Sequence, residues 1–205
     1  NSFRYYNHWK KLNQKETILP DATFNDSRDI VVLVIGESAR SKNFSLYGYE
    51  RETNPLMKAD SVTALKAKAS DTYTTAAVKA ILQHEQSRTL YEILPNYLFR
   101  NGVDVIWRTS NWGTPPIHVE KMFTKGTLRQ MYPECNGDYD GILLAGLKQE
   151  IEKSKADKIF IGLHTYTSHG PSYFSNTPDE FKKFIPECTT VEMAQADRQE
   201  LINAY

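Results

Sequence analysis

An uninterrupted run of β-branched and aliphatic residues occupies positions 30–35, between Asp29 and Gly36. Both faces of the strand that it predicts are apolar, which is typical of a central strand in a parallel sheet covered by helices. Segments 103–108 and 158–164 are similar, and each follows a turn or a charged stretch. The sequence therefore predicts that these three segments are strands of one largely parallel sheet.

Helices are predicted between and after these strands. In the second of them, the proline at position 95 predicts a kink or an early end. Because strands alternate with helices of about ten residues or more, we expect an α/β fold with a mostly parallel central sheet flanked by helices. The four predicted helices are 76–85, 87–99, 139–153 and 191–204.

No internal repeat and no linker is visible in the sequence, so we expect one domain over residues 29–205, with residues 1–28 leading into it. The 205 residues include 25 Lys+Arg and 25 Asp+Glu, so the formal charge is zero. A neutral chain lacks the cationic excess that a sequence-independent nucleic-acid binder needs. The longest apolar run is too short to cross a bilayer, and residues 1–14 show no leader, so we expect a soluble piece.

The chain contains two cysteines, Cys135 and Cys188. Two cysteines cannot complete a four-cysteine zinc site or a dense disulfide framework. They form one disulfide or remain two free thiols, and composition leaves both alternatives open.

Polar residues that follow the predicted strands are the first candidates for a functional site, because ligands bind beyond the carboxyl ends of the strands in an open α/β sheet. Glu37 follows Gly36, and its carboxylate could bind a divalent metal or could simply favour a helix N-terminus. His164 and His169 lie at the end of the strand 158–164 and in the loop after it. Their imidazoles could bind a metal or donate hydrogen bonds to an anionic substrate, or each could be structural.

Threonines at positions 72, 74 and 75 directly precede the helix predicted at 76–85. Capping the helix is the ordinary role of a threonine in this place. The free N–H groups of a helix N-terminus also bind phosphate or sulfate, so a hydroxyl there could lie beside such a group. A metal that lowered the pKa of that hydroxyl would turn it into a nucleophile that forms a covalent intermediate.

Taken together, these segments resemble the phosphoethanolamine transferases of the alkaline-phosphatase/sulfatase superfamily. Residues 35–40 and 45–55 are similar to the GE[ST]-x-R and GY-x-R-x-T-x-P signatures of that family. Residues 163–173 are similar to its L-H-x-x-G-S-H-G-P-x-Y loop, and residues 184–188 and 201–205 resemble two further blocks. Five such segments in the family's order make the resemblance specific.

The resemblance implies a Zn²⁺-dependent enzyme with an alkaline-phosphatase/sulfatase-like fold. It implies that Glu37 is a zinc ligand, and that a threonine at the start of the helix is both a zinc ligand and the nucleophile. Thr74 is preferred because it keeps a Tyr-Thr pair found in some relatives, and Thr75 is the alternative. The residues that would bind the substrate phosphate or assist the leaving group are His164, His169 and Asn111.

The reaction that the resemblance implies is transfer of phosphoethanolamine from phosphatidylethanolamine, through a covalent phosphoethanolamine-threonine intermediate. The acceptor would be lipid A, core oligosaccharide, or a hydroxyl of a protein or glycan. A hydrolase or phosphoglycerol transferase of the same superfamily is one alternative, and a non-catalytic glycan-binding module is another. Members of the family are bacterial inner-membrane proteins with the catalytic domain in the periplasm.

Two departures from the family pattern affect these expectations. The family completes its zinc site with an Asp-His pair and a late His beyond the block that residues 201–205 resemble. We therefore expect residues 29–205 to be the N-terminal part of a catalytic domain that is inactive alone, with residues 1–28 linking it to a missing membrane domain. The partners of the family's short-range disulfides are also absent, and a single Cys135–Cys188 bridge would suit a periplasmic protein.

Overall fold

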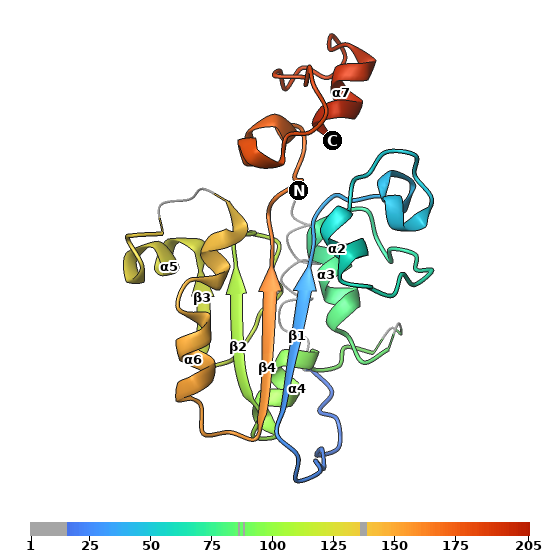
Figure 1. Ribbon diagram of the computed structural model, residues 1–205. Coiled ribbons are helices and arrows are strands. Elements are labelled where there is room, and N and C mark those ends of the chain that lie inside the picture. Colours follow the sequence, from blue (N-terminus) through green and yellow to red (C-terminus); the bar gives the residue numbers. More distant parts are fainter. Residues whose placement is uncertain (1–15, 86, 88, 136–138) are drawn as a thin grey trace, which may run out of the picture.

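The computed structural model describes residues 16–85, 87, 89–135 and 139–205. Its described part contains a four-stranded parallel sheet in the order β1-β4-β2-β3 (Figure 1). The strands are β1 (Asp29–Ile35), β2 (Asp104–Thr109), β3 (Lys121–Thr124) and β4 (Lys158–His164). The α-helices are α2 (Pro55–Ala59), α3 (Thr74–Leu82), α4 (Leu94–Arg100), α5 (Lys125–Met131), α6 (Leu147–Lys153) and α7 (Arg198–Ala204), with short 3₁₀ helices between them.

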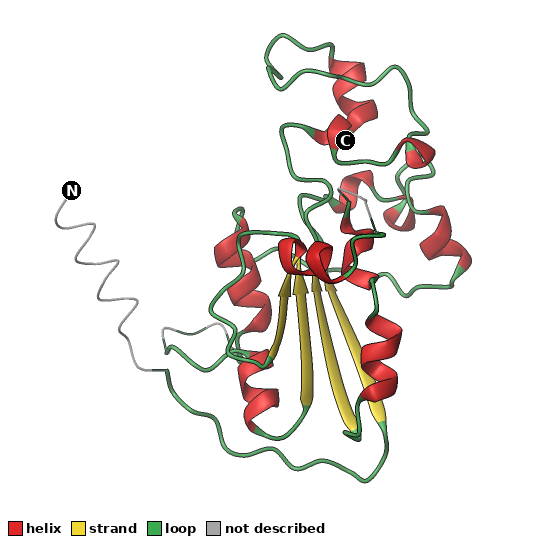
Figure 2. Cartoon of the chain, turned by 90° about the vertical axis from the view of Figure 1, so that its left-hand side faces the viewer, coloured by secondary structure: helices red, strands yellow, loops and turns green. Residues whose placement is uncertain are grey.

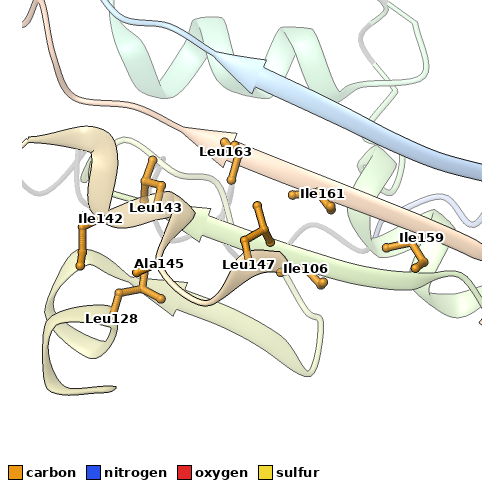
Figure 3. Packing of buried hydrophobic residues seen from close by; sticks show 9 residues of the cluster. All are labelled: Ile106, Leu128, Ile142, Leu143, Ala145, Leu147, Ile159, Ile161 and Leu163. Carbon is orange, nitrogen blue, oxygen red and sulfur yellow. The ribbon is translucent and has the colours of Figure 1, made fainter. Parts of the chain in front are cut away.

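Helices cover both faces of the two inner strands, β2 and β4 (Figure 2). One face packs against α5, α6 and the 3₁₀ helix Asp140–Leu144 (Figure 3). The other face packs against α3 and the apolar side of α4. Alternate residues of β2 point to opposite faces, Ile106 to the first and Val105 and Trp107 to the second. The α/β fold with a parallel sheet that the sequence predicts is therefore confirmed.

The position of β1 differs from the expectation of a central strand. In the described part of the chain β1 lies at the edge of the sheet and pairs with β4 alone. The side chains of Ile30, Val31, Val32 and Val34 are 46–60% exposed, and Ile35 is buried against α3. The apolar run correctly predicts a parallel strand, but it does not predict which segments cover that strand.

The helix boundaries differ from the predicted ones for identifiable local reasons. The predicted helix 139–153 is divided, because Gly146 adopts the left-handed conformation with φ 62° between the 3₁₀ helix and α6. Pro95 falls in the first turn of α4, where proline is tolerated, so that helix begins at Leu94. The last helix is only α7, which begins after Asp197 caps it by accepting from the backbone N–H of Gln199 and Glu200. The strand β3 was not expected from the sequence.

The described part of the predicted lead-in segment is anchored to α4. The backbone N–H of Leu19 donates to Glu92 Oε1 at 2.9 Å, and that of Ala22 donates to Asn101 Oδ1 at 2.6 Å. Arg100 donates both to Glu92 and to the carbonyl of Leu19. Residues 16–22 are thus held against α4 and the residues that flank it. Residues 1–15 lie outside the described residues.

Both cysteines are free thiols, so the Cys135–Cys188 bridge is not formed. Cys135 packs against the cluster around α5 and α6. Cys188 is buried beside α7, where its backbone N–H donates to the carbonyl oxygen of Glu200 and its thiol donates to that of Thr190. Nor does any helix in the described part of the chain have the length and apolar character that crossing a bilayer requires.

Candidate active site

The carboxyl ends of β1, β2 and β4 meet at one edge of the sheet (Figure 1). His164, at the end of β4, is in register with Ile35 of β1 on one side and with Thr109 of β2 on the other. The loops that follow these strands therefore begin side by side. The candidate residues of the first, second and fourth strands come together there, as sequence analysis predicts for a parallel sheet.

The centre of this edge is a close pair formed by Glu37 and Thr74. The Thr74 hydroxyl donates to Glu37 Oε1 at 2.5 Å, and the Ser38 hydroxyl donates to Glu37 Oε2 at 2.9 Å. The amide of Asn111 also donates to Glu37 Oε1, at 3.3 Å. Partial burial raises the pKa of Glu37, but the three hydrogen bonds outweigh it and hold the pKa below its ordinary value. Glu37 is therefore a carboxylate at neutral pH.

Thr74 is the first residue of α3, and Thr75 is the second. Only the Thr74 hydroxyl is directed at Glu37, whereas Thr75 is an exposed residue on the next position of the helix. The N-terminus of α3 also places backbone N–H groups beside the Thr74 hydroxyl, where they favour a negatively charged ligand. The geometry thus brings the hydroxyl of Thr74, and not that of Thr75, to the Glu37 carboxylate.

Asn111 joins the loops after β2 and β4 to the Glu37–Thr74 pair. Its side chain is 8% exposed and donates both to Glu37 and to the carbonyl oxygen of Thr165, at 3.1 Å. The carbonyl oxygen of the same side chain accepts from the N–H of Gly113 at 3.0 Å. All three polar positions of the amide have partners, so the orientation of Asn111 is fixed.

The two histidines of the β4 loop lie in different surroundings. His164 is completely buried, and its Nδ1 lies 3.3 Å from Thr109 Oγ1 and 3.1 Å from Thr114 Oγ1. Its Nε2 has no hydrogen-bond partner among the described residues. Burial lowers the pKa of His164 below its ordinary value, so its imidazole is neutral at pH 7. Because the ring is completely buried, it lies beneath the surface of the site.

His169 is partly exposed. Its ring stacks on that of Tyr166, with centroids 4.9 Å apart and planes inclined by 12°, and its backbone N–H donates to the Tyr166 carbonyl. The positive charge that His169 can carry contributes to the low pKa of Glu37. Of the two histidines, His169 is the one that is exposed to solvent.

Asp140 is a residue of this region that sequence analysis missed. Its Oδ2 accepts from the backbone N–H of Thr167 at 2.7 Å, its Oδ1 accepts from that of Tyr166 at 3.0 Å, and the Ser110 hydroxyl donates to it as well. The carboxylate therefore holds the loop between His164 and His169 against the end of β2. A lone aspartate inside a predicted helix gives no signal for such a role.

Two oxygen donors for a metal are present at the centre of the site, Glu37 Oε1 and Thr74 Oγ1. A carboxylate and a hydroxyl are oxygen ligands that suit a hard or borderline divalent cation such as zinc. No three His, Cys, Asp or Glu side chains converge anywhere in the described residues. Because zinc takes about four ligands, this pair fits one half of a zinc site.

A cavity of about 660 Å³ opens beside this centre. Its wall includes Ser38 and Ser168, the neighbours of Glu37 and His169, and the end of α7 closes it on the far side. The hydroxyl of Tyr205 accepts from the N–H of Arg40 at 2.8 Å, which joins the end of the described chain to the loop after β1. The apolar part of the lining includes Phe44, Leu56, Met57, Phe181 and Phe184.

Comparison with known proteins assigns this chain to a family. The sulfatase family model matches residues 29–205. Phosphoethanolamine transferase EptA from Helicobacter pylori is 36% identical, over 91% of this chain and 37% of that protein. The chain thus spans little more than a third of this relative's length.

Two solved structures share the fold. The C-terminal periplasmic domain of phosphoethanolamine transferase EptC from Campylobacter jejuni has a TM-score of 0.75 and is 30% identical, over 87% of this chain and 58% of that one. The integral membrane protein lipooligosaccharide phosphoethanolamine transferase A from Neisseria meningitidis has a TM-score of 0.79 and is 26% identical, over 99% of this chain and 41% of that one. These matches confirm the sulfatase-like fold that the sequence predicts, and the chain belongs to the sulfatase family.

Proposed function

We propose that this chain is part of the catalytic domain of a phosphoethanolamine transferase. The observation that carries the proposal is the 2.5 Å hydrogen bond from the Thr74 hydroxyl to Glu37, at the N-terminus of α3. This hydrogen bond supports the proposal because a hydroxyl that could act as a nucleophile, a carboxylate and the anion-binding end of a helix meet at one point. The relatives described above are named phosphoethanolamine transferases, which supports this chemistry over sulfate ester hydrolysis.

In the first step, the Thr74 oxygen forms a bond to the phosphorus of phosphatidylethanolamine. The bond from phosphorus to the glycerol oxygen breaks, and the Thr74 proton passes toward Glu37, which already accepts a hydrogen bond from it. Diacylglycerol leaves after its oxygen gains a proton, for which His169 is the suitable donor. The product is phosphoethanolamine esterified to Thr74.

In the second step, a hydroxyl or phosphate oxygen of the acceptor attacks the same phosphorus. The bond from phosphorus to the Thr74 oxygen breaks. A hydroxyl acceptor passes its proton to His169, which lost one in the first step, and the threonine oxygen regains the proton that Glu37 took up. The N–H groups at the start of α3 would donate hydrogen bonds to the phosphoryl oxygens. Asn111 would hold Glu37 in place through the hydrogen bond that it donates to the carboxylate, and buried His164 would support the loop beneath them.

Zinc held by Glu37 and Thr74 would supply positive charge that lowers the pKa of the threonine hydroxyl and stabilises the phosphoryl oxygens. The remaining ligands would come from outside the described residues, since Glu37 and Thr74 are half of a set of about four. The apolar cavity beside Ser38 would take up the lipid part of the donor. The natural setting that we propose is the periplasmic face of a bacterial inner membrane, to which a domain outside this chain attaches the protein.

The test uses the gene product as the cell makes it, incubated with phosphatidylethanolamine vesicles and analysed by intact mass. A gain of one phosphoethanolamine, located on Thr74 and abolished by zinc chelation, is the expected result. Thr74→Ala should remove the gain and Thr75→Ala should keep it, which makes the neighbouring residue a matched control. Rapid release of free phosphoethanolamine without an acceptor would instead indicate a hydrolase. Absence of any adduct in the zinc-loaded protein would contradict the proposal.

A further inference from the structure

Three aromatic rings form a row that leads from the surface to the candidate active site. The innermost ring is His169, which stacks on Tyr166 with centroids 4.9 Å apart. The outermost ring is Trp112, whose centroid lies 5.8 Å from that of Tyr166, with an angle of 40° between the planes. The row joins two loops, because Trp112 follows β2 and the other two rings follow β4.

The outer member of this row is unusually exposed. Trp112 is 89% exposed, although it directly follows Asn111, which is 8% exposed and donates to Glu37. Indole is the largest apolar side chain, and leaving it in water costs the favourable free energy that burial would give. A packing role in the core, which Trp107 fulfils on β2, does not account for Trp112.

The backbone on both sides of the row is held in place before any ligand binds. Asn111 is fixed by Thr165 and Gly113, so the loop that carries Trp112 has little freedom. Tyr166 is fixed through its backbone N–H, which donates to Asp140. A surface that is ordered in advance loses less conformational entropy when a ligand binds to it.

We propose that Trp112 and Tyr166 form a stacking platform for a sugar ring of the acceptor. This inference rests on the proposed function and narrows its acceptor to a glycolipid or glycan; the N. meningitidis relative is named for a lipooligosaccharide. The C–H face of a pyranose ring packs on the face of an indole or phenol ring, while the sugar hydroxyl groups remain in water. A sugar stacked there would lie beside Trp112, which directly follows Asn111, and beside Tyr166, which stacks on His169. It would therefore lie close to the phosphoethanolamine group that it must receive.

The donor is a less suitable occupant of the platform. Neither Trp112 nor Tyr166 is among the described residues that line the 660 Å³ cavity, whose apolar wall suits a lipid. The platform and the cavity therefore give the acceptor and the donor separate approaches to Thr74. The two half-reactions should respond differently to changes in the platform.

The experiment separates these half-reactions in the gene product as the cell makes it. Formation of the Thr74 adduct from phosphatidylethanolamine is measured without acceptor, and transfer is then measured with deacylated lipooligosaccharide, which retains the sugars. Trp112→Ala should leave adduct formation unchanged and raise the KM for the acceptor about three- to tenfold, the range expected for one aromatic stacking contact. Trp112→Phe should restore most of the affinity. Phe24→Ala is the control, because Phe24 is 43% exposed and belongs to the segment that leads into the first residue of β1, whereas the site lies beyond the carboxyl ends of the strands.

A second measurement does not depend on turnover. Binding of deacylated lipooligosaccharide is measured by calorimetry in the Thr74→Ala protein, with and without Trp112→Ala. The same three- to tenfold loss of affinity is expected. Unchanged affinity and KM in Trp112→Ala would overturn the proposed platform. Slower adduct formation in this variant would also overturn it, because it would indicate that the aromatic row binds the donor and not the acceptor. Absence of an adduct in the unmodified protein would instead contradict the proposed function, and the binding measurement would still decide the platform.

Discussion

Gly113 packs against Thr74 so closely that a Cβ atom added at Gly113 would lie 2.6 Å from the Thr74 Cγ2. The same atom would lie 2.9 Å from the Thr74 Cβ, so the contact involves the part of the side chain nearest the backbone. Position 113 therefore controls where the Thr74 hydroxyl lies relative to Glu37. The loop after β2 therefore contributes to the site in two ways: Gly113 leaves room for the Thr74 side chain, and Asn111 donates a hydrogen bond to Glu37.

Gly113→Ala should accordingly displace Thr74 and slow adduct formation from phosphatidylethanolamine. Misplacement of a reacting group by about 1 Å can cost about 100-fold in rate, so a 10- to 100-fold decrease is expected. Single-turnover measurement of the Thr74 adduct by mass checks this. Gly126→Ala is the matched control, because a Cβ there meets nothing closer than 3.7 Å and should leave the rate unchanged. A wild-type rate in Gly113→Ala would show that the helix accommodates the methyl group.

Asp140→Asn should loosen the loop that carries Tyr166 and His169. The replacement keeps the shape of the side chain but turns one acceptor oxygen into a donor, which opposes the N–H groups of Tyr166 and Thr167. Loss of charged hydrogen bonds of this kind costs about 1–3 kcal/mol. Faster hydrogen exchange at those two amides is the measurement, and Ser110→Ala, which removes a different partner of Asp140, should change their exchange less. Unaltered exchange in Asp140→Asn would contradict the assigned role.

The sequence was sufficient to predict the fold class and to indicate which residues meet at the centre of the candidate site. Glu37 could be found because a polar residue directly after an apolar strand lies at the ligand-binding edge of a parallel sheet. Thr74 could be separated from Thr75 only by resemblance, because the preference depends on which hydroxyl faces Glu37. His164 was expected to touch the substrate, but its burial depends on the packing of β2 and β4 around it, which no local pattern records.

Other features depend on contacts between distant segments and left no signal. Asp140 accepts hydrogen bonds from backbone N–H groups of another loop. Because nearly every residue has a backbone N–H, the sequence does not show which ones an aspartate will contact. The row of Trp112, Tyr166 and His169 requires two loops to meet in space. The exposed face of β1 has a similar cause, since an apolar run shows that a strand is suited to burial on both faces but not what covers it.

Gly162→Ala should destabilise the domain through the core rather than the site. Gly162 lies on β4 opposite Trp107 of β2, and a Cβ added there would lie 2.2 Å from the Trp107 ring. The indole is fully buried between the sheet and its helices, so it cannot move aside without disturbing its neighbours. Overpacking of this kind costs about 1–3 kcal/mol, which a shift of the urea midpoint would measure. An unchanged midpoint would show that the ring moves freely.

Glu92→Gln should make the free energy of unfolding of the domain less dependent on pH in the acidic range. Glu92 is 4% exposed and accepts from two nitrogens of Arg100, at 2.7 and 3.1 Å, and from the N–H of Leu19. The hydrogen bonds from Arg100 lower the pKa of Glu92, and burial opposes them only in part. A lowered folded-state pKa means that this carboxylate stabilises the fold above its unfolded pKa of about 4.3, and that the contribution disappears as the pH falls through the folded-state value.

The free energy of unfolding of Glu92→Gln should therefore be about 2 kcal/mol lower than that of the unmodified protein at pH 7, the scale of lost hydrogen bonds to a charged group. The difference should shrink steadily as the pH is lowered below about 4, where the unmodified protein also carries a neutral carboxyl. Urea unfolding at a series of pH values measures both quantities, with Glu134→Gln, at an exposed glutamate, as the control. A difference that stays constant across this range would mean that packing of the side chain, and not its charge, joins residues 16–22 to α4.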